Sequence, residues 1–482
     1  MIKKGAPVFA GIDQGTTSTR ILVVDDEGNY DIAHVCSHKQ ITPKLGWVEH
    51  DPEDLMSSLN ACLDSIENVQ SLGIDNQGET IVAWDKDTGE AVYNAIVWQD
   101  SRTHKEINEL KQKGLEDEVK KLSGLPLDPY FSASKFSWII KNVPKARELL
   151  AKKRLMIGTT ETFFIYRLTG EYFADYATAS RTSLMNINTM QWDERLCEIF
   201  EVPLEILAPL RDCSCIFGTV KHNGESYPLA ASIVDQFACL YGHGCRKSGD
   251  LKITFGTGAF IEVLTGESPL ECNNGPVPML AWRNDGKAMF GLDGGVYNAA
   301  SAMNWFKNIS LIDSFKDICS FEKDYAINRD LMFVPALSGL ACPYWDRTGS
   351  AMLVGMGLDT TKKDIVQAAL EGIALRTNTV LNRMAENIAI KDILSVDGGM
   401  SVNPYFMQFL ADITQKTVRV PACKEVSALG AAMLGRKALG FNDEISISGE
   451  DTLYTPRDID AKAIVDKYEN LIEKSIGLRQ AI

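Results

Sequence analysis

The chain has 482 residues, of which 45% are hydrophobic and 23% are charged, a balance typical of a soluble globular protein. Its formal net charge of −15 argues against nucleic acid or an anionic membrane surface as a main partner. Backbone donors bind anions locally whatever the total charge, so ligands that carry phosphate are not excluded.

Cysteine usage and the lack of membrane signals favour a cytoplasmic protein. Eleven cysteines are scattered along the chain, Cys213 and Cys215 are the closest pair, and no C-x-x-C pair occurs. A disulfide framework or a zinc site normally shows tighter spacing, so we expect free thiols. The first residues contain too few apolar side chains for a secretory signal, and no run of about 18 apolar residues could span a membrane.

The first predicted element is a β-hairpin with a polar tip. An apolar strand over residues 8–12 meets a turn of glycine and threonine, and a strand rich in β-branched residues follows over 21–24. Leucine-rich tracts at 54–66 and 105–122 predict helices.

Between these two helices, "SLGIDNQGETIVAWD" (residues 71–85) reads as a strand, a polar turn and a second strand. The turn contains Asn76, Gln77, Gly78 and Glu79. Turns of this kind often line binding sites, so the small residue at its centre raises the question of what lies opposite it.

A second strand–turn–strand unit occurs at residues 250–268, where the turn is Gly256-Thr257-Gly258. Strands and helices alternate in both halves of the chain, which predicts an α/β fold built as two similar lobes. We place the boundary in segment 242–248, which we expect to be a hinge, and this gives domains 1–244 and 245–482.

The C-terminal half is predicted to contain a long helix over residues 360–388, with Thr361 as its N-cap. Its expected buried face consists of Val366, Leu370, Ile373, Val380 and Met384. A short strand, the turn Asp397-Gly398-Gly399 and another helix follow over 392–413, and a last helix covers 458–476.

Three glycine turns are candidate phosphate sites: Asp13-Gln14-Gly15-Thr16-Thr17, Gly256-Thr257-Gly258 and Asp397-Gly398-Gly399. Glycine lets the backbone approach a ligand closely, and successive N–H groups bind anions. Neither a Walker-A motif nor G-x-G-x-x-G is present, so any phosphates would be bound by hairpin turns. Asp13 then either anchors Mg²⁺, directly or through water, or only caps its turn.

Long stretches of the chain resemble the FGGY carbohydrate kinases, and within that family they are most similar to glycerol kinases. Both family signatures are present, as "YFSASKFSWIIKN" (130–142) and "AMLVGMGLDTTKKDIVQAALE" (351–371). Further matching stretches are "GIDQGTTSTR", "GWVEHDPEDL", "NAIVWQDSRT", "ASRTSLMNINTMQWDERL", "VPALSGLACPYWD" and "VDGGMSVNPYFMQFLADI".

The resemblance implies two actin-like (RNase-H-like) lobes with the active site in the cleft between them, and ATP and Mg²⁺ as cofactors. It implies nucleotide contacts from Thr16, Thr17, Ser18, Arg20, Thr257, Ala300, Asn304, Gly399 and Asn403. Ala300 and Asn304 stand where glycine and glutamine are usual in glycerol kinases.

For the acceptor, the resemblance implies a small polyol or sugar bound by Glu79, Tyr130, Asp235 and Gln236, with Trp98 and Phe260 as apolar walls. Asp235 is then the expected general base, which takes the proton of a primary hydroxyl as that oxygen attacks phosphorus. Family members are commonly dimers or tetramers, so we expect a homo-oligomer.

Gly78 departs from the family, which usually has an arginine that binds glycerol hydroxyls at this position. Three interpretations remain open. A longer tetritol, pentitol or ketopentose could fill the space. Another side chain, such as Arg102 or His243, could take the place of the missing arginine and restore a glycerol site. Alternatively, ordered water could fill the space while glycerol is still used, with a higher KM. Two other classes are a non-enzymatic actin-like ATPase and a sugar-binding relative that no longer transfers phosphate.

Overall fold

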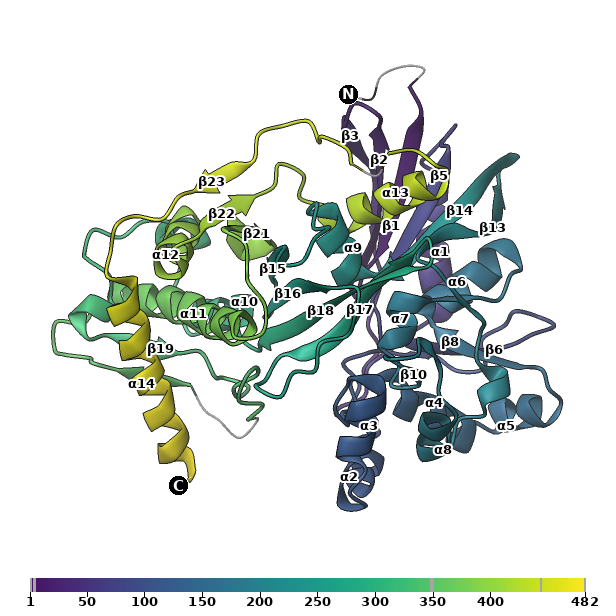
Figure 1. The fold of residues 1–482 in the computed structure, drawn as a ribbon, viewed down its shortest axis with the longest axis horizontal. Helices are drawn as coiled ribbons and strands as arrows, with labels where there is room; N and C mark the ends of the chain where they lie inside the picture. Colours follow the sequence, from purple (N-terminus) through teal and green to yellow (C-terminus); the bar gives the residue numbers. More distant parts are fainter. Residues whose placement is uncertain (1, 3–5, 347–350, 443, 481–482) are drawn as a thin grey trace.

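The computed structural model describes residues 2, 6–346, 351–442 and 444–480, and it consists of two lobes, each built around a mixed β-sheet (Figure 1). None of the helices in this described part of the chain is long and apolar enough to cross a bilayer.

The first lobe contains a six-stranded sheet in the order β13-β14-β5-β1-β2-β3. Antiparallel pairing joins β1 to β2 and β2 to β3, whereas β1, β5 and β14 run parallel. The strands are β1 (Val8–Gln14), β2 (Ser18–Asp25), β3 (Tyr30–Ser37), β5 (Ser71–Asn76), β13 (Ser214–His222) and β14 (Glu225–Val234).

The second lobe contains a seven-stranded sheet in the order β17-β18-β16-β15-β21-β22-β23. The strands are β15 (Leu251–Phe255), β16 (Ala259–Gly266), β17 (Val277–Asn284), β18 (Lys287–Val296), β21 (Ile393–Asp397), β22 (Thr417–Val420) and β23 (Thr452–Tyr454). Five consecutive strands, β18-β16-β15-β21-β22, repeat the pairing pattern of β3-β2-β1-β5-β14. The prediction of two similar α/β lobes is therefore confirmed.

A smaller four-stranded sheet, β4-β7-β6-β8, is inserted into the first lobe. Its strands are β4 (Glu49–His50), β6 (Ile81–Asp85), β7 (Ala95–Ile96) and β8 (Leu155–Thr159). The remaining short strands are β9 (Ala174–Asp175), β10 (Met185–Asn186), β11 (Gln191–Trp192), β12 (Leu210–Arg211), β19 (Met332–Val334) and β20 (Met352–Val354).

The helices of the first half are α1 (Pro52–Leu63), α2 (His104–Gln112), α3 (Glu116–Ser123), α4 (Ser132–Asn142), α5 (Pro144–Ala151), α6 (Thr160–Thr169), α7 (Tyr176–Ser180), α8 (Glu194–Phe200) and α9 (Asp235–Gly242). Those of the second half are α10 (Ala300–Asn308), α11 (Lys362–Ala385), α12 (Pro404–Thr414), α13 (Val426–Ala438) and α14 (Ala461–Gln480).

Two helix predictions have different outcomes. The predicted long helix is α11, whose N-cap Thr361 forms a capping box with Asp364, and its predicted apolar face is buried. The single helix predicted over 105–122 is wrong, because the chain forms α2 and α3 with a break between them. Gly114 in this break has φ +75°, a left-handed conformation that interrupts a helix.

Helix α13 belongs to the C-terminal half of the chain but packs on β1 and β5 of the first sheet and on α9 (Figure 1). The packing is close enough to require glycine. A Cβ atom at Gly11 would lie 1.8 Å from the Ala428 carbonyl oxygen, and one at Gly430 would lie 1.8 Å from that of Ala238. The division at residue 244, between α9 and β15, stays a prediction.

Substitution of Gly430 by alanine tests this close packing. Alanine favours a helix by about 1 kcal/mol over glycine, but the new methyl group would overlap the Ala238 carbonyl. We expect the clash to prevail and to lower the free energy of unfolding by about 1–3 kcal/mol, measured by thermal unfolding. Lys437→Ala, on the same helix, is the control and should change stability by less than about 0.5 kcal/mol.

Candidate active site

Three carboxylates meet at one edge of the first sheet. Asp13 near the end of β1 pairs in register with Asp75 on the parallel strand β5. Asn76, the next residue on β5, pairs with Val234 at the end of β14, and Asp235 follows immediately as the first residue of α9. Because the three strands run parallel, their carboxyl ends bring Asp13, Asp75 and Asp235 together.

Burial raises the pKa values of these acids, and repulsion by neighbouring carboxylates adds to the shifts of Asp75 and Asp235. Desolvation raises the pKa of Asp235 to about 7, and the charges of Asp13 and Glu79 act in the same direction. The pKa of Asp75 is raised well above its usual value by burial and then by Asp13 and Asp235. Burial also raises the pKa of Asp13, although the positive charge of the nearby Arg20 opposes this shift.

This acidic group has the donor set that Mg²⁺ requires. Neither carboxylate oxygen of Asp75 has a hydrogen-bond partner within the described residues, and both are buried. Buried unpaired carboxylates are costly, and oxygen ligands are those that Mg²⁺ prefers. The sequence interpretation had singled out Asp13 alone. Asp75 comes next to Asp13 only through the pairing of β5 with β1, which no local sequence pattern indicates.

The residues predicted to bind phosphates in the first lobe surround the turn between β1 and β2. Arg20 lies 3.6 Å from Asp13 and donates to Ser18 Oγ at 2.6 Å and to Glu425 Oε2 at 2.5 Å. Glu425 directly precedes α13, so Arg20 connects this turn to the C-terminal half. Thr17 is exposed at the tip of the turn.

The acceptor residues are joined to the same turn through Trp98. Its indole Nε1 donates to Thr16 Oγ1 at 3.0 Å, and its ring packs edge-on against Tyr130 with centroids 5.5 Å apart. Phe260 on β16 is half-buried and pairs with Gly295 on β18. The Gln236 backbone donates to Asp235 Oδ1 at 2.7 Å.

An unpredicted arginine lies among the residues that are predicted to bind the acceptor. Arg181, the residue after α7, donates from Nε to Glu79 Oε1 at 2.7 Å, and both side chains are buried. Its Nη2 lies 3.7 Å from Asp293 on β18 of the second lobe, and its guanidinium lies 5.9 Å from the Tyr130 ring. Its Nη1 is buried without a hydrogen-bond partner among the residues described.

Neither of the two side chains considered as replacements for the missing arginine is available. The Arg102 guanidinium is fully buried, paired with Asp100 at 2.8 Å and Glu49 at 2.6 Å, and stacked on Trp47. His243 is buried and bonded to Ser395 Oγ at 2.7 Å. That interpretation of Gly78 is therefore wrong for these two residues, because their existing partners hold them elsewhere.

The second-lobe residues form a group around the Gly256-Thr257-Gly258 turn. The Thr257 carbonyl accepts from the N–H groups of Ala299 and Ser301, and the Gly256 carbonyl accepts from Ala300 N–H at 3.0 Å. These bonds attach the turn to the start of α10, on which Asn304 is exposed one turn later.

Two residues after β21 are predicted to contact the nucleotide, Gly399 and Asn403, and their surroundings differ. At Gly399 a Cβ atom would meet nothing within 4 Å, so the backbone there is open to a ligand. The Asn403 side chain is occupied, since its Oδ1 caps α12 at Phe406 N–H and its Nδ2 donates to the Ile318 carbonyl. The Asn403 side chain therefore holds the start of α12 next to Ile318.

Comparison with known proteins agrees with this arrangement. Residues 8–232 match the N-terminal domain, and residues 251–439 the C-terminal domain, of the FGGY family of carbohydrate kinases. The chain is 38% identical to the glycerol kinase of Agathobacter rectalis, with 91% of each chain covered. It is 36% identical to glycerol kinase 2 of Thermotoga maritima, over 97% of this chain and 98% of the relative.

Solved structures give the same result. A crystal structure of Plasmodium falciparum glycerol kinase with ADP has a TM-score of 0.89 and 31% identity, with 98% of each chain covered. A xylulose kinase from Lactobacillus acidophilus shares the fold, with a TM-score of 0.84 at 21% identity. The chain belongs to the FGGY family of carbohydrate kinases, and it is an ATP-dependent phosphotransferase that acts on an alcohol group of a sugar or polyol.

Proposed function

We propose that the enzyme transfers the γ-phosphoryl group of ATP to a primary hydroxyl of a small polyol, with Asp235 as the general base. The observation that carries this proposal is the position of Asp235, which lies near both Asp13 at the strand ends and the predicted acceptor residue Glu79 and has a pKa of about 7. A base whose pKa lies near the working pH is deprotonated often enough to act and basic enough to accept the proton.

The remaining residues have binding and positioning roles. Asp13 and Asp75 would hold Mg²⁺, which when bound neutralises charge on the phosphates, and Asp235 would stay free to accept the proton. Backbone N–H groups of the turns at Thr16 and Thr257 would bind phosphate oxygens from the two lobes. Trp98 connects the two halves of the site, because its ring contacts Tyr130 and its N–H fixes the Thr16 hydroxyl.

On the acceptor side, Arg181 offers a guanidinium beside Glu79; it lies in a stretch that resembles glycerol kinases, so it acts in addition to the arginine that position 78 lacks and does not replace it. Glu79 orients it through a short charged hydrogen bond, and its unpaired Nη1 is free to donate to a substrate hydroxyl. Glu79 in turn would accept from a second hydroxyl. A carboxylate and a guanidinium side by side are suited to a vicinal pair of hydroxyl groups, as glycerol has.

Gly78 favours a second candidate, a polyol or ketose of four or five carbons. A Cβ atom at this position would meet only one atom within 4 Å, Val234 Cγ2 at 3.0 Å, so the space beside Gly78 is largely open. Additional carbons and hydroxyls of a longer substrate would then occupy that space.

A substrate panel distinguishes these candidates. ADP release would be measured at saturating Mg-ATP with glycerol, dihydroxyacetone, erythritol, threitol, ribitol, xylitol, ribulose and xylulose. If glycerol gives the highest kcat/KM, the result supports the small-polyol proposal. If the kcat/KM of a four- or five-carbon substrate exceeds that of glycerol by about tenfold, or roughly 1.4 kcal/mol, the longer substrate replaces it.

Two variants of Gly78 separate space from backbone strain. Gly78 has φ +79°, which strains any other residue, so Gly78→Ala is the matched control for Gly78→Arg. We expect Gly78→Arg to lower kcat/KM for four- and five-carbon substrates relative to glycerol by about tenfold, and Gly78→Ala to leave this ratio unchanged. An equal change of this kcat/KM ratio in both variants would mean that backbone strain causes the effect, and that the space filled by the arginine side chain does not matter.

The pH dependence of activity follows from the pKa of Asp235. Because the carboxyl must be deprotonated to accept a proton, kcat/KM should be constant above pH about 7 and should fall about tenfold per unit below it. The initial rate would be measured between pH 5.5 and 8.5, at saturating Mg-ATP, with corrections for the titration of ATP itself. A rate independent of pH down to about 5 would indicate a carboxylate with an ordinary pKa and would contradict this role.

A further inference from the structure

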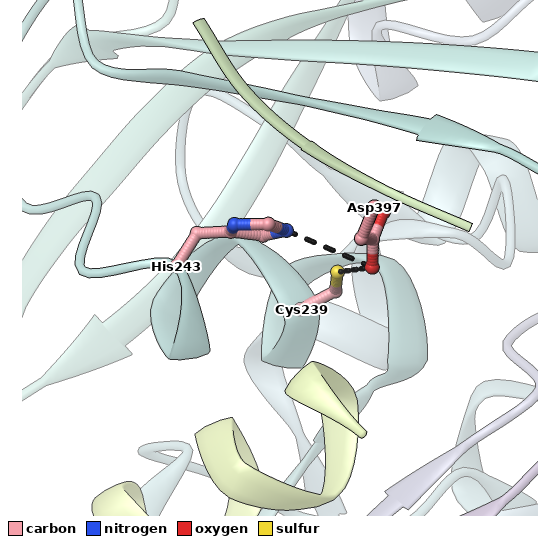
Figure 2. Close-up of side chains that lie close together, drawn as sticks. All are labelled: Cys239, His243 and Asp397. Carbon is pink, nitrogen blue, oxygen red and sulfur yellow. Dashed lines mark hydrogen bonds and ion pairs between the residues drawn. The ribbon is translucent and has the colours of Figure 1, made fainter. Parts of the chain in front are cut away.

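A cysteine, a histidine and an aspartate form a compact buried group at the junction of the two lobes (Figure 2). Cys239 and His243 lie four residues apart on and just after α9, so they share one helix face. Asp397 ends β21 in the second sheet. The ligand-type atoms of all three residues lie within 4.8 Å of one another.

The spacing of these atoms is close to that of a tetrahedral zinc site. Cys239 Sγ lies 3.2 Å from Asp397 Oδ2, and His243 Nε2 lies 3.6 Å from the same oxygen. Zinc binds sulfur at about 2.3 Å and nitrogen or oxygen at about 2.0–2.2 Å, which places tetrahedral ligands roughly 3.4–3.6 Å apart. Small side-chain movements would bring all three atoms into this geometry.

The surroundings hold the histidine in a suitable orientation. His243 Nδ1 contacts Ser395 Oγ at 2.7 Å, and Arg419 binds both this oxygen and the His243 carbonyl. Such a contact on one ring nitrogen fixes the ring and leaves the other nitrogen for a metal. His243 Nε2 and Asp397 Oδ1 are both buried and lack hydrogen-bond partners within the described residues.

The local charges also suit a divalent cation. A thiolate at Cys239 and the carboxylate of Asp397 would together balance two positive charges. Two cations act on this group, and each has a carboxylate partner that offsets its charge: Lys252 lies 2.8 Å from the buried Glu262, and Arg419 lies 3.8 Å from Asp451. Asp397 is 13% exposed, which gives a cation an entry path from the side of the Gly398-Gly399 turn.

We propose that Cys239, His243 and Asp397 form a binding site for a thiophilic divalent transition metal, most suitably Zn²⁺, with a fourth position open to water. This site is distinct from the Mg²⁺ position, because its ligands include sulfur and nitrogen. It joins the helix that begins with Asp235 to the strand that precedes the Gly398-Gly399 turn. The spacing of cysteines along the sequence did not indicate it, because its ligands come from residues 239, 243 and 397.

Cobalt titration tests this proposal directly. The full-length protein, free of any affinity tag, would be stripped with a chelator and titrated with Co²⁺ in the absence of nucleotide, which itself binds metals. We expect one cobalt per chain, with the intense sulfur-to-cobalt charge-transfer absorption of a thiolate ligand, and displacement of cobalt by Zn²⁺. Zinc alone should also raise the unfolding temperature.

Three variants complete the experiment. Cys239→Ala should abolish the charge-transfer absorption, and His243→Gln should weaken cobalt binding at least about 100-fold. Cys245→Ala, a buried cysteine outside the group, is the matched control and should bind cobalt like the parent. The absence of a charge-transfer band in the parent, or its persistence in a folded Cys239→Ala variant, would overturn the proposal and leave the three side chains as a hydrogen-bonded contact between the lobes.

Discussion

Replacement of Asp235 by asparagine is expected to lower kcat by about 10²–10⁴-fold, the usual contribution of a positioned general base. Asparagine keeps the size and the hydrogen bond from the Gln236 backbone to the side-chain oxygen, but it cannot accept a proton. The measurement is the rate of ADP release at saturating Mg-ATP and acceptor. Thermal stability should not decrease, because the change removes a desolvated acid beside Asp13 and Glu79.

Asp64→Asn is the control for this experiment, since Asp64 lies on the surface, where it pairs with His222. It should retain the parent rate. An Asp235→Asn variant with more than about a tenth of the parental kcat would contradict the role of Asp235, since a general base contributes at least about 10².

Replacement of Arg181 by methionine is expected to have two separable effects. Methionine fills much of the volume but leaves the buried Glu79 carboxylate without its partner, which should lower the free energy of unfolding by about 3–5 kcal/mol. Separately, the loss of a charged hydrogen-bond donor to the acceptor should lower kcat/KM roughly 10- to 150-fold, which corresponds to about 1.5–3 kcal/mol of transition-state stabilisation.

A second substitution separates stability from recognition. Combining Arg181→Met with Glu79→Gln removes the unpaired charge, so the double variant should regain part of the lost stability without regaining kcat/KM for the acceptor. Arg181→Lys should keep the charge and lose the planar fork, and its kcat/KM should be intermediate. Parental kcat/KM in a folded Arg181→Met variant would show that this residue only stabilises Glu79.

The parts of the fold that local patterns determine were predictable from the sequence. The hairpin at residues 8–24 alternates apolar strands with a glycine turn, and the 360–388 segment contains both its cap and its apolar face. The helix break at Gly114 was missed because the charged tract around it keeps helical periodicity on both sides.

The remaining features depend on contacts between distant segments. Asp75 reaches the active site through its register with β1, and Arg181 contacts Glu79 across 102 positions of sequence. Arg102 was considered for the acceptor site because no local pattern reveals its burial by Glu49 and Asp100. The family resemblance identified the residues that relatives share, whereas Gly78 showed only that this chain's acceptor site differs from theirs.

The most direct test of the proposed function is the stoichiometry of phosphate transfer. Parent enzyme and Asp235→Asn would each be incubated with Mg-ATP, with and without the best acceptor of the panel, and ADP and phosphate ester would be quantified. We predict acceptor-dependent ADP release by the parent, one phosphate ester per ADP, and loss of both in Asp235→Asn. Release of ADP at the same rate without acceptor, with inorganic phosphate as the product, would contradict the proposal and indicate an ATPase.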